Sequence, residues 1–252
     1  MSQAAPAAHF ERVSDIDAES PTLIEGLPGL GMVASIAVDQ ITSQLGLDYY
    51  GNIQSDALPP LAAFNEGRIR DAVRVYAGPD PSVMTLQSDV PIPPNAIQSL
   101  SKCVYRDLAD EFDRAIFLVG AQAESENQIG AVSGVATSDE MESALTDAGI
   151  SLAEESGAVG GVTGGLVVDC YHNDIPTAVL IVRCDPRLPD PSAAQAVIED
   201  ALEPLVEFDI DTSELEEQAE KIRKQKQQIA RQLQQMQQQQ GGEPTQTRTM
   251  FQ

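Results

Sequence analysis

Short apolar runs alternate with longer helix-like stretches along residues 20–210, and this alternation limits the folds open to the chain more than any other feature. The predicted strands lie at 22–25, 72–76, 82–86, 115–119 and 177–182, and the predicted helices at 32–45, 95–111, 138–148, 162–172 and 191–205. Such alternation is typical of an α/β domain in which helices cover a sheet. The last two strands are apolar at almost every position, as expected for strands covered on both faces. We therefore predict one layered α/β domain with a central mixed, mostly parallel sheet, preceded by a polar segment at residues 1–19.

Residues 211–240 follow a different pattern, in which apolar side chains recur every seven positions. About four heptads predict a C-terminal coiled-coil helix, although a core lysine and many glutamines weaken the pattern. The predicted interface consists of Leu215, Ile222, Ile229, Leu233 and Met236. Two arrangements remain open, because the helix can pack on a partner helix or on its own body.

The last twelve residues, 241–252, read as a flexible tail with a docking motif at its end. Residues 241–249 are polar and rich in Gly, Pro and Thr, so they have little to bury. They are followed by Met250, Phe251 and Gln252, which combine an apolar side chain, an aromatic ring and a terminal carboxylate. We expect this end to insert into another protein.

Acidic residues dominate the predicted domain and limit its partners. The net charge is −24, and residues 1–210 hold 33 acidic and 9 basic residues, whereas residues 211–252 hold six of each. Dispersed carboxylates keep a surface hydrated in concentrated salt, so we expect a halophilic archaeon. The domain lacks the basic surface that nucleic acid or an anionic membrane requires. Three cysteines, the absence of a long apolar run and the absence of a leader predict a cytoplasmic protein.

One glycine-rich segment matches a ligand-binding fingerprint. Gly29-x-Gly31-x-x-Ala34 follows a predicted strand and opens a predicted helix, as in dinucleotide-binding folds, and Asp48 lies near the distance of the ribose-binding acid. A nucleotide- or small-molecule-binding α/β enzyme that uses Gly29 and Gly31 is therefore the alternative function. The same glycines also suit tight packing between strand and helix.

The remaining candidates for chemistry do not form a constellation. The run at 157–165 lacks the Lys-Ser/Thr ending of a phosphate loop, and residues 169–172 place metal-capable side chains on different sides of a helix. Glu124 and Glu126 form a carboxylate pair of a kind that an acidic chain produces by chance. We therefore expect no catalytic residues, no metal site and no cofactor.

Four segments, taken in order, carry a resemblance to a known family. They are Leu23–Val33, Pro91–Pro94, Gly160–Gly165 and Asp190–Ala194. Together they resemble the proteasome assembly chaperone family, the archaeal relatives of the eukaryotic second proteasome assembly chaperone. The resemblance implies a phosphorylase/hydrolase-like α/β fold without the active site of nucleoside phosphorylases, a homo-oligomer, and binding to the α-subunits of the 20S proteasome.

The same resemblance gives the tail a role. Members of the family can end in a hydrophobic residue, a tyrosine and any residue, and this motif inserts between proteasome α-subunits. Met250 and Gln252 match its first and last positions, whereas Phe251 lacks the tyrosine hydroxyl. The missing hydrogen bond lowers the affinity by about 0.5–1.5 kcal/mol. The resemblance thus implies a non-enzymatic chaperone with Met250, Phe251 and Gln252 as its proteasome-binding residues.

Overall fold

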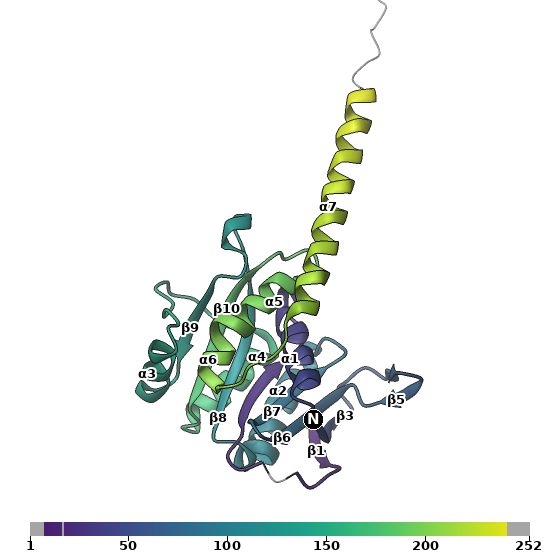
Figure 1. Ribbon diagram of the computed structural model, residues 1–252. Helices are drawn as coiled ribbons and strands as arrows, with labels where there is room; N and C mark the ends of the chain where they lie inside the picture. Colours follow the sequence, from purple (N-terminus) through teal and green to yellow (C-terminus); the bar gives the residue numbers. More distant parts are fainter. Residues whose placement is uncertain (1–7, 17, 241–252) are drawn as a thin grey trace, which may run out of the picture.

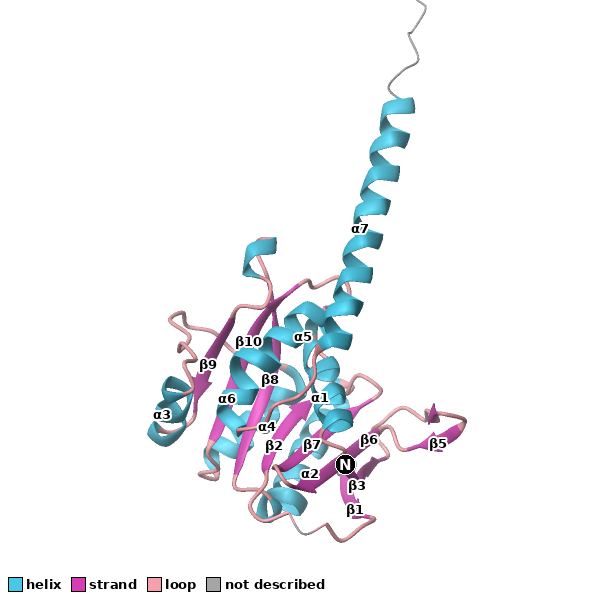
Figure 2. Cartoon of the chain, viewed as in Figure 1, coloured by secondary structure: helices cyan, strands magenta, loops and turns pink. Residues whose placement is uncertain are grey.

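The computed structural model describes residues 8–16 and 18–240, with the backbone alone at residues 226, 227 and 229–240. An eight-stranded sheet in the order β1-β3-β6-β7-β2-β8-β10-β9 forms its centre (Figures 1 and 2). Its strands are β1 (Ala8–Arg12), β2 (Thr22–Gly26), β3 (Asp48–Ser55), β6 (Val73–Pro79), β7 (Ser82–Ser88), β8 (Arg114–Gln122), β9 (Val132–Ala136) and β10 (Thr177–Cys184). A separate hairpin consists of β4 (Ala63–Asn65) and β5 (Arg68–Arg70).

The helices are distributed along the chain between these strands. They are α1 (Val33–Gln44), α2 (Pro94–Leu108), α3 (Asp139–Asp147), α4 (Gly161–His172), α5 (Pro191–Val197), α6 (Glu203–Val206) and α7 (Ser213–Gln240). A π-helical turn, η4 (Ile198–Leu202), joins α5 to α6, and 3-10 turns lie at η1 (Leu30–Met32), η2 (Ala109–Glu111) and η3 (Glu126–Gln128). The five predicted helices are confirmed, with small differences at their ends.

The sheet is mixed, and its parallel part is smaller than expected. Strands β7, β2, β8 and β10 run parallel, whereas β1, β3, β6 and β7 pair antiparallel in succession and β9 pairs antiparallel with β10. The prediction of a mostly parallel sheet is therefore wrong outside the centre. The short connection between β6 and β7 is the physical reason at that pair, since strands joined by a tight turn can only pair antiparallel.

The central strands bury both faces, which explains their continuous apolar sequence. Along these strands Ile116 and Leu180 face a cluster that includes α1, α3 and α5. Their neighbours Phe117 and Val179 face the opposite cluster, with α2 and α4. Alternate side chains of a strand point to opposite faces, so each central strand contributes to two layers of core.

Several strands carry too weak a signal for the sequence to predict. Strands β1 and β9 form the two edges of the sheet and are largely half-buried or exposed, so they lack an apolar run. β1 lies within the segment that the sequence analysis treated as polar. Strand β3 contains Gly51 and Asn52, which resemble a turn in sequence but are buried here.

Candidate functional site

The parallel strands all end on the same side of the molecule, and ligand sites of α/β proteins usually form beyond these carboxyl ends. The loops after β2, β7, β8 and β10 meet there. Two cavities open among these loops, with volumes of about 790 and 920 Å³. The glycine-rich segment identified in the sequence lines the first of them.

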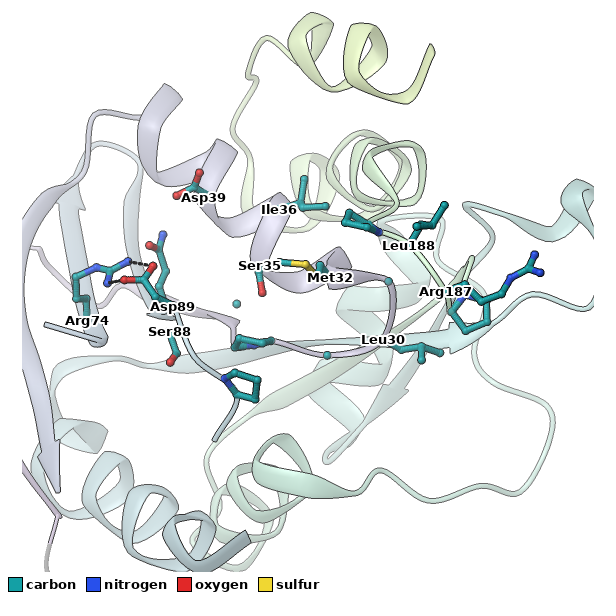
Figure 3. A pocket seen from close by; sticks show the side chains of 18 of the residues that line it. Leu30, Met32, Ser35, Ile36, Asp39, Arg74, Ser88, Asp89, Arg187 and Leu188 are labelled. Carbon is teal, nitrogen blue, oxygen red and sulfur yellow. Dashed lines mark hydrogen bonds and ion pairs between the residues drawn. The ribbon is translucent and has the colours of Figure 1, made fainter. Parts of the chain in front are cut away.

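Figure 3 shows the first cavity, with Leu30, Met32 and Ser35 labelled among its lining residues. The two fingerprint glycines that line it have different roles. Gly31 has a φ of +63°, and a Cβ at this position would lie 2.7 Å from Cys184 Sγ. A Cβ on Gly29 would meet nothing within 4 Å. A Cβ on Gly120, at the end of β8, would lie 2.2 Å from the Leu30 carbonyl oxygen. Gly31 and Gly120 therefore permit close packing of the loop on the strand ends, whereas Gly29 borders open space.

Three arginines line the same cavity, and two of them, Arg70 and Arg74, are paired with one carboxylate. The Arg74 side chain is 3% exposed, and its Nη2 donates to Asp89 Oδ1 at 3.0 Å. Arg70 Nη2 donates to the same oxygen at 2.7 Å. Burial favours a higher pKa for Asp89, but the hydrogen bonds and charges of the two arginines outweigh it and hold this pKa below its usual value. The pairing leaves both cations poorly disposed to bind a phosphate.

The acid that the dinucleotide fingerprint needs is also in the wrong place. Asp48 is the first residue of β3, and β6 and β7 separate β3 from β2 in the sheet. The pairings make β3 run in the same direction as β2. Asp48 therefore lies at the amino ends of these strands, whereas Gly29 and Gly31 lie beyond the carboxyl end of β2. A ribose-binding acid would have to lie near the carboxyl end of a neighbouring strand.

The other candidates for chemistry remain separate in the described residues. Burial raises the pKa of Cys103 to about 12 and those of Cys170 and Cys184 to about 11, so these thiols are poor nucleophiles. Glu124 and Glu126 line the second cavity and are exposed. Across residues 8–16 and 18–240, no three His, Cys, Asp or Glu side chains gather as a metal site would require.

A buried carboxyl group on β2 was missed by the sequence analysis. Glu25 is 0% exposed, and its Oε1 accepts hydrogen bonds from Leu27 N at 3.3 Å and from Thr163 Oγ1 at 3.1 Å. Its Oε2 has no partner in the described part of the chain. Burial raises the pKa of Glu25 to about 8, and the hydrogen bonds only partly offset this effect. The signal was present in the sequence as a single acid inside an apolar strand.

The C-terminal helix α7 begins on the body and then leaves it. Leu215 is 2% exposed and belongs to the core cluster shared with α1 and α5. Ala219 and Ile222 line the second cavity, opposite the loops after β8 and β10. Of the two arrangements left open, packing on its own body is therefore the one seen at the start of α7. Beyond these turns the helix projects from the body (Figure 1).

Several predicted binding residues cannot be placed. The side chains of Ile229, Leu233 and Met236 lie outside the description of the helix, and Met250, Phe251 and Gln252 lie outside the described residues altogether. The part of α7 with described side chains contributes Leu215 to the core and Ile222 to the wall of a cavity. No residue of the predicted docking motif is therefore tested by the structure.

The fold and the cavities define a class of protein. It is an α/β body with a covered mixed sheet, no assembled catalytic constellation among the described residues, and a projecting C-terminal helix. None of the described helices combines the length and apolar character that a membrane crossing needs.

The particular family follows from the sequence. A model of the PAC2 family matches residues 23–230, so the chain belongs to the PAC2 family. The resemblance found in the sequence is thereby confirmed.

Two solved structures share the fold over nearly their whole length, and a further protein is similar in sequence over most of its length. Pyrococcus furiosus PbaA, described as an archaeal homolog of proteasome-assembly chaperone, is 23% identical and matches with a TM-score of 0.79 over 92% of this chain and 96% of its own. Pyrococcus furiosus PbaB, described as an archaeal proteasome activator, is 17% identical, with a TM-score of 0.79 over 89% and 99%. An uncharacterized protein of Methanocaldococcus jannaschii, MJ0106, is 28% identical over 213 residues, which cover 84% of this chain and 87% of that protein.

Proposed function

We propose that this PAC2 protein is a non-enzymatic proteasome assembly chaperone that binds the 20S core by inserting its C-terminal tail between α-subunits. The observation that carries the proposal is helix α7, which is fixed to the body at Leu215 and then projects from it toward the end of the chain. A helix of 28 residues spans about 42 Å. The descriptions of PbaA and PbaB, which share the fold, support a proteasome as the target.

The docking motif suits recognition of a pocket. Met250 and Phe251 supply apolar surface for burial, and the carboxylate of Gln252 supplies a charge for a cation in the pocket. A phenylalanine keeps the aromatic contact of tyrosine and loses only one neutral hydrogen bond, worth about 0.5–1.5 kcal/mol. Several tails on one oligomer would bind together and compensate for a weak single contact.

Removal of residues 250–252 tests the proposal. We expect the shortened protein to lose association with purified 20S particles in a high-salt pull-down, because both the anchors and the native carboxylate position are gone. Its thermal melt and oligomer mass should stay unchanged, since the body is untouched. The matched control is Thr249→Ala, which alters the neighbouring residue and keeps the motif.

The aromatic position gives a graded version of the same experiment. Phe251→Tyr should bind at least as tightly as the natural protein, and Phe251→Ala should bind far more weakly. Undiminished binding by the shortened protein would show that the tail is not the anchor, and the proposal would then be abandoned.

A further inference from the structure

The hairpin β4–β5 carries the most exposed large apolar side chains among the described residues. Phe64 and Ile69 lie directly opposite each other in the pairing and are 73% and 74% exposed. Leu61, just before the hairpin, is 59% exposed. Strands of three residues are too short to form a stable hairpin alone, and a cluster of exposed apolar side chains marks a contact surface. The hairpin therefore has the character of a contact element without its partner.

The base of the hairpin is tied to the body by a partly exposed ion pair at the first cavity. Arg70, the last residue of β5, is bound to Asp89, which also pairs with the buried Arg74. The turn residues Glu66 and Gly67 both have positive φ, as in the tight turns that favour hairpins. A contact element that is fixed before binding loses little conformational entropy when it docks.

The charge of the hairpin is opposite to that of most of the body. Residues 63–70 hold two basic residues, Arg68 and Arg70, and one acidic residue, Glu66 in the turn, so the hairpin carries a small positive charge. Arg68 is exposed and makes no ion pair within the described part of the chain. A basic, apolar protrusion on a strongly acidic body is suited to an acidic partner surface that also carries apolar residues.

Such a surface exists at the β9 edge of the eight-stranded sheet, on β9, α3 and the loop that follows. Residues 132–158 hold six acidic residues and no basic ones. All six acids, on α3 and the following loop, are exposed. Val135 on β9 is 41% exposed, and Leu152, which forms a bridge with Gly134, is 36% exposed. We define this region as the β9–α3 surface.

We propose that the hairpin of one copy docks on the β9–α3 surface of a second copy. Phe64 and Ile69 would cover Val135 and Leu152, and Arg68 would face the acidic side chains. The partner is a second copy because one chain carries both complementary surfaces, one on the separate β4–β5 hairpin and the other at the β9 edge of the eight-stranded sheet. Two different surfaces make a heterologous contact, which repeats from copy to copy and closes into a ring when the rotation permits.

A ring of this kind would also fix how the C-terminal helices of the copies are arranged. Cyclic symmetry places every α7 on the same side of the assembly. The self-association itself does not depend on the proposed proteasome binding, and it is measured with the purified protein alone.

Light scattering during size-exclusion chromatography, in the high-salt buffer that an acidic protein requires, tests the contact. We expect natural protein to elute as an oligomer, and Phe64→Asp with Ile69→Asp to elute near the 26.9 kDa of one chain. Arg68→Glu should weaken the oligomer in the same direction. These side chains are exposed, so a melt like that of the natural protein should accompany the loss. The matched control, Val168→Asp with Tyr171→Asp, changes exposed residues on α4 and should keep the mass.

Mixing variants separates a head-to-tail contact from a symmetric one. Val135→Asp with Leu152→Asp should also be monomeric, yet it retains an intact hairpin. Mixed with the hairpin variant, which retains an intact β9–α3 surface, it should form a dimer and no larger species. The proposal fails if natural protein is monomeric, if the hairpin variant keeps its mass, if the α4 control also loses it, or if the mixture forms no dimer.

Discussion

Replacement of Glu25 by glutamine should change how stability depends on pH. Burial raises the pKa of Glu25 from 4.5 in the unfolded chain to about 8 in the folded protein. Between these values the folded state keeps a proton that the unfolded state has lost. Stability from the protonated group is therefore fully present below about pH 4.5 and is lost as the pH rises toward 8. Glu25→Gln cannot lose a proton, so its stability should lack this dependence.

The size of the effect follows from the two pKa values. Within the window each pH unit lowers the free energy of unfolding by about 1.4 kcal/mol. Integration from about pH 5 to about pH 7.5 gives a loss of about 3 kcal/mol for the natural protein relative to Glu25→Gln. Because desolvation is the largest cause of the shift, the difference should persist in concentrated salt, which screens exposed charges far more than buried ones.

Urea denaturation at a series of pH values in constant salt measures the difference. The control is Glu124→Gln, which neutralises an exposed glutamate and should keep the pH slope of the natural protein. A parallel dependence for natural protein and Glu25→Gln would show that Glu25 titrates normally in the folded state. The buried, protonated carboxyl group would then be refuted.

Three further substitutions test the packing of the loop and of the C-terminal helix. Gly31→Ala should lower the free energy of unfolding by about 2–4 kcal/mol in urea denaturation, through the positive φ and the contact with Cys184, whereas Gly29→Ala should change it little; equal effects would contradict the distinction between them. Leu215→Ala should cost about 2–5 kcal/mol because it empties a core position, and light scattering should find the oligomer mass unchanged. A fall in mass instead would assign Leu215 to a contact between copies.

The central strands were predictable because a strand buried on both faces needs apolar residues at nearly every position of a short segment. The runs at 115–119 and 177–182 are apolar on both faces, and these segments are the covered strands β8 and β10. The edge strands were not predictable from an apolar run. Each of them pairs with only one strand and is partly exposed, so its residues need not be continuously apolar.

The candidate site was predictable only as a set of separate segments. The fingerprint at Gly29 and Gly31 does open a helix at the carboxyl edge of the sheet, as expected. The prediction that Asp48 would act as the ribose-binding acid is wrong. The sequence distance between the glycines and Asp48 does not reveal that two strands lie between β2 and β3 in the sheet. Likewise, the pairing of Arg70 and Arg74 with Asp89 joins residues from different strands and a loop, so no local pattern marks it.

Local periodicity and the order of short segments were enough to predict the α/β class, the central strands, the helical character of residues 213–240 and the family. Which surface each periodic element packs against became visible only in the folded chain. The fold assigned Leu215 to its own core, gave Gly31 a packing role against Cys184, and left Phe64 and Ile69 exposed on a hairpin. A heptad or an apolar residue encodes a need for burial, but the partner that satisfies this need is set by contacts between segments far apart in the chain.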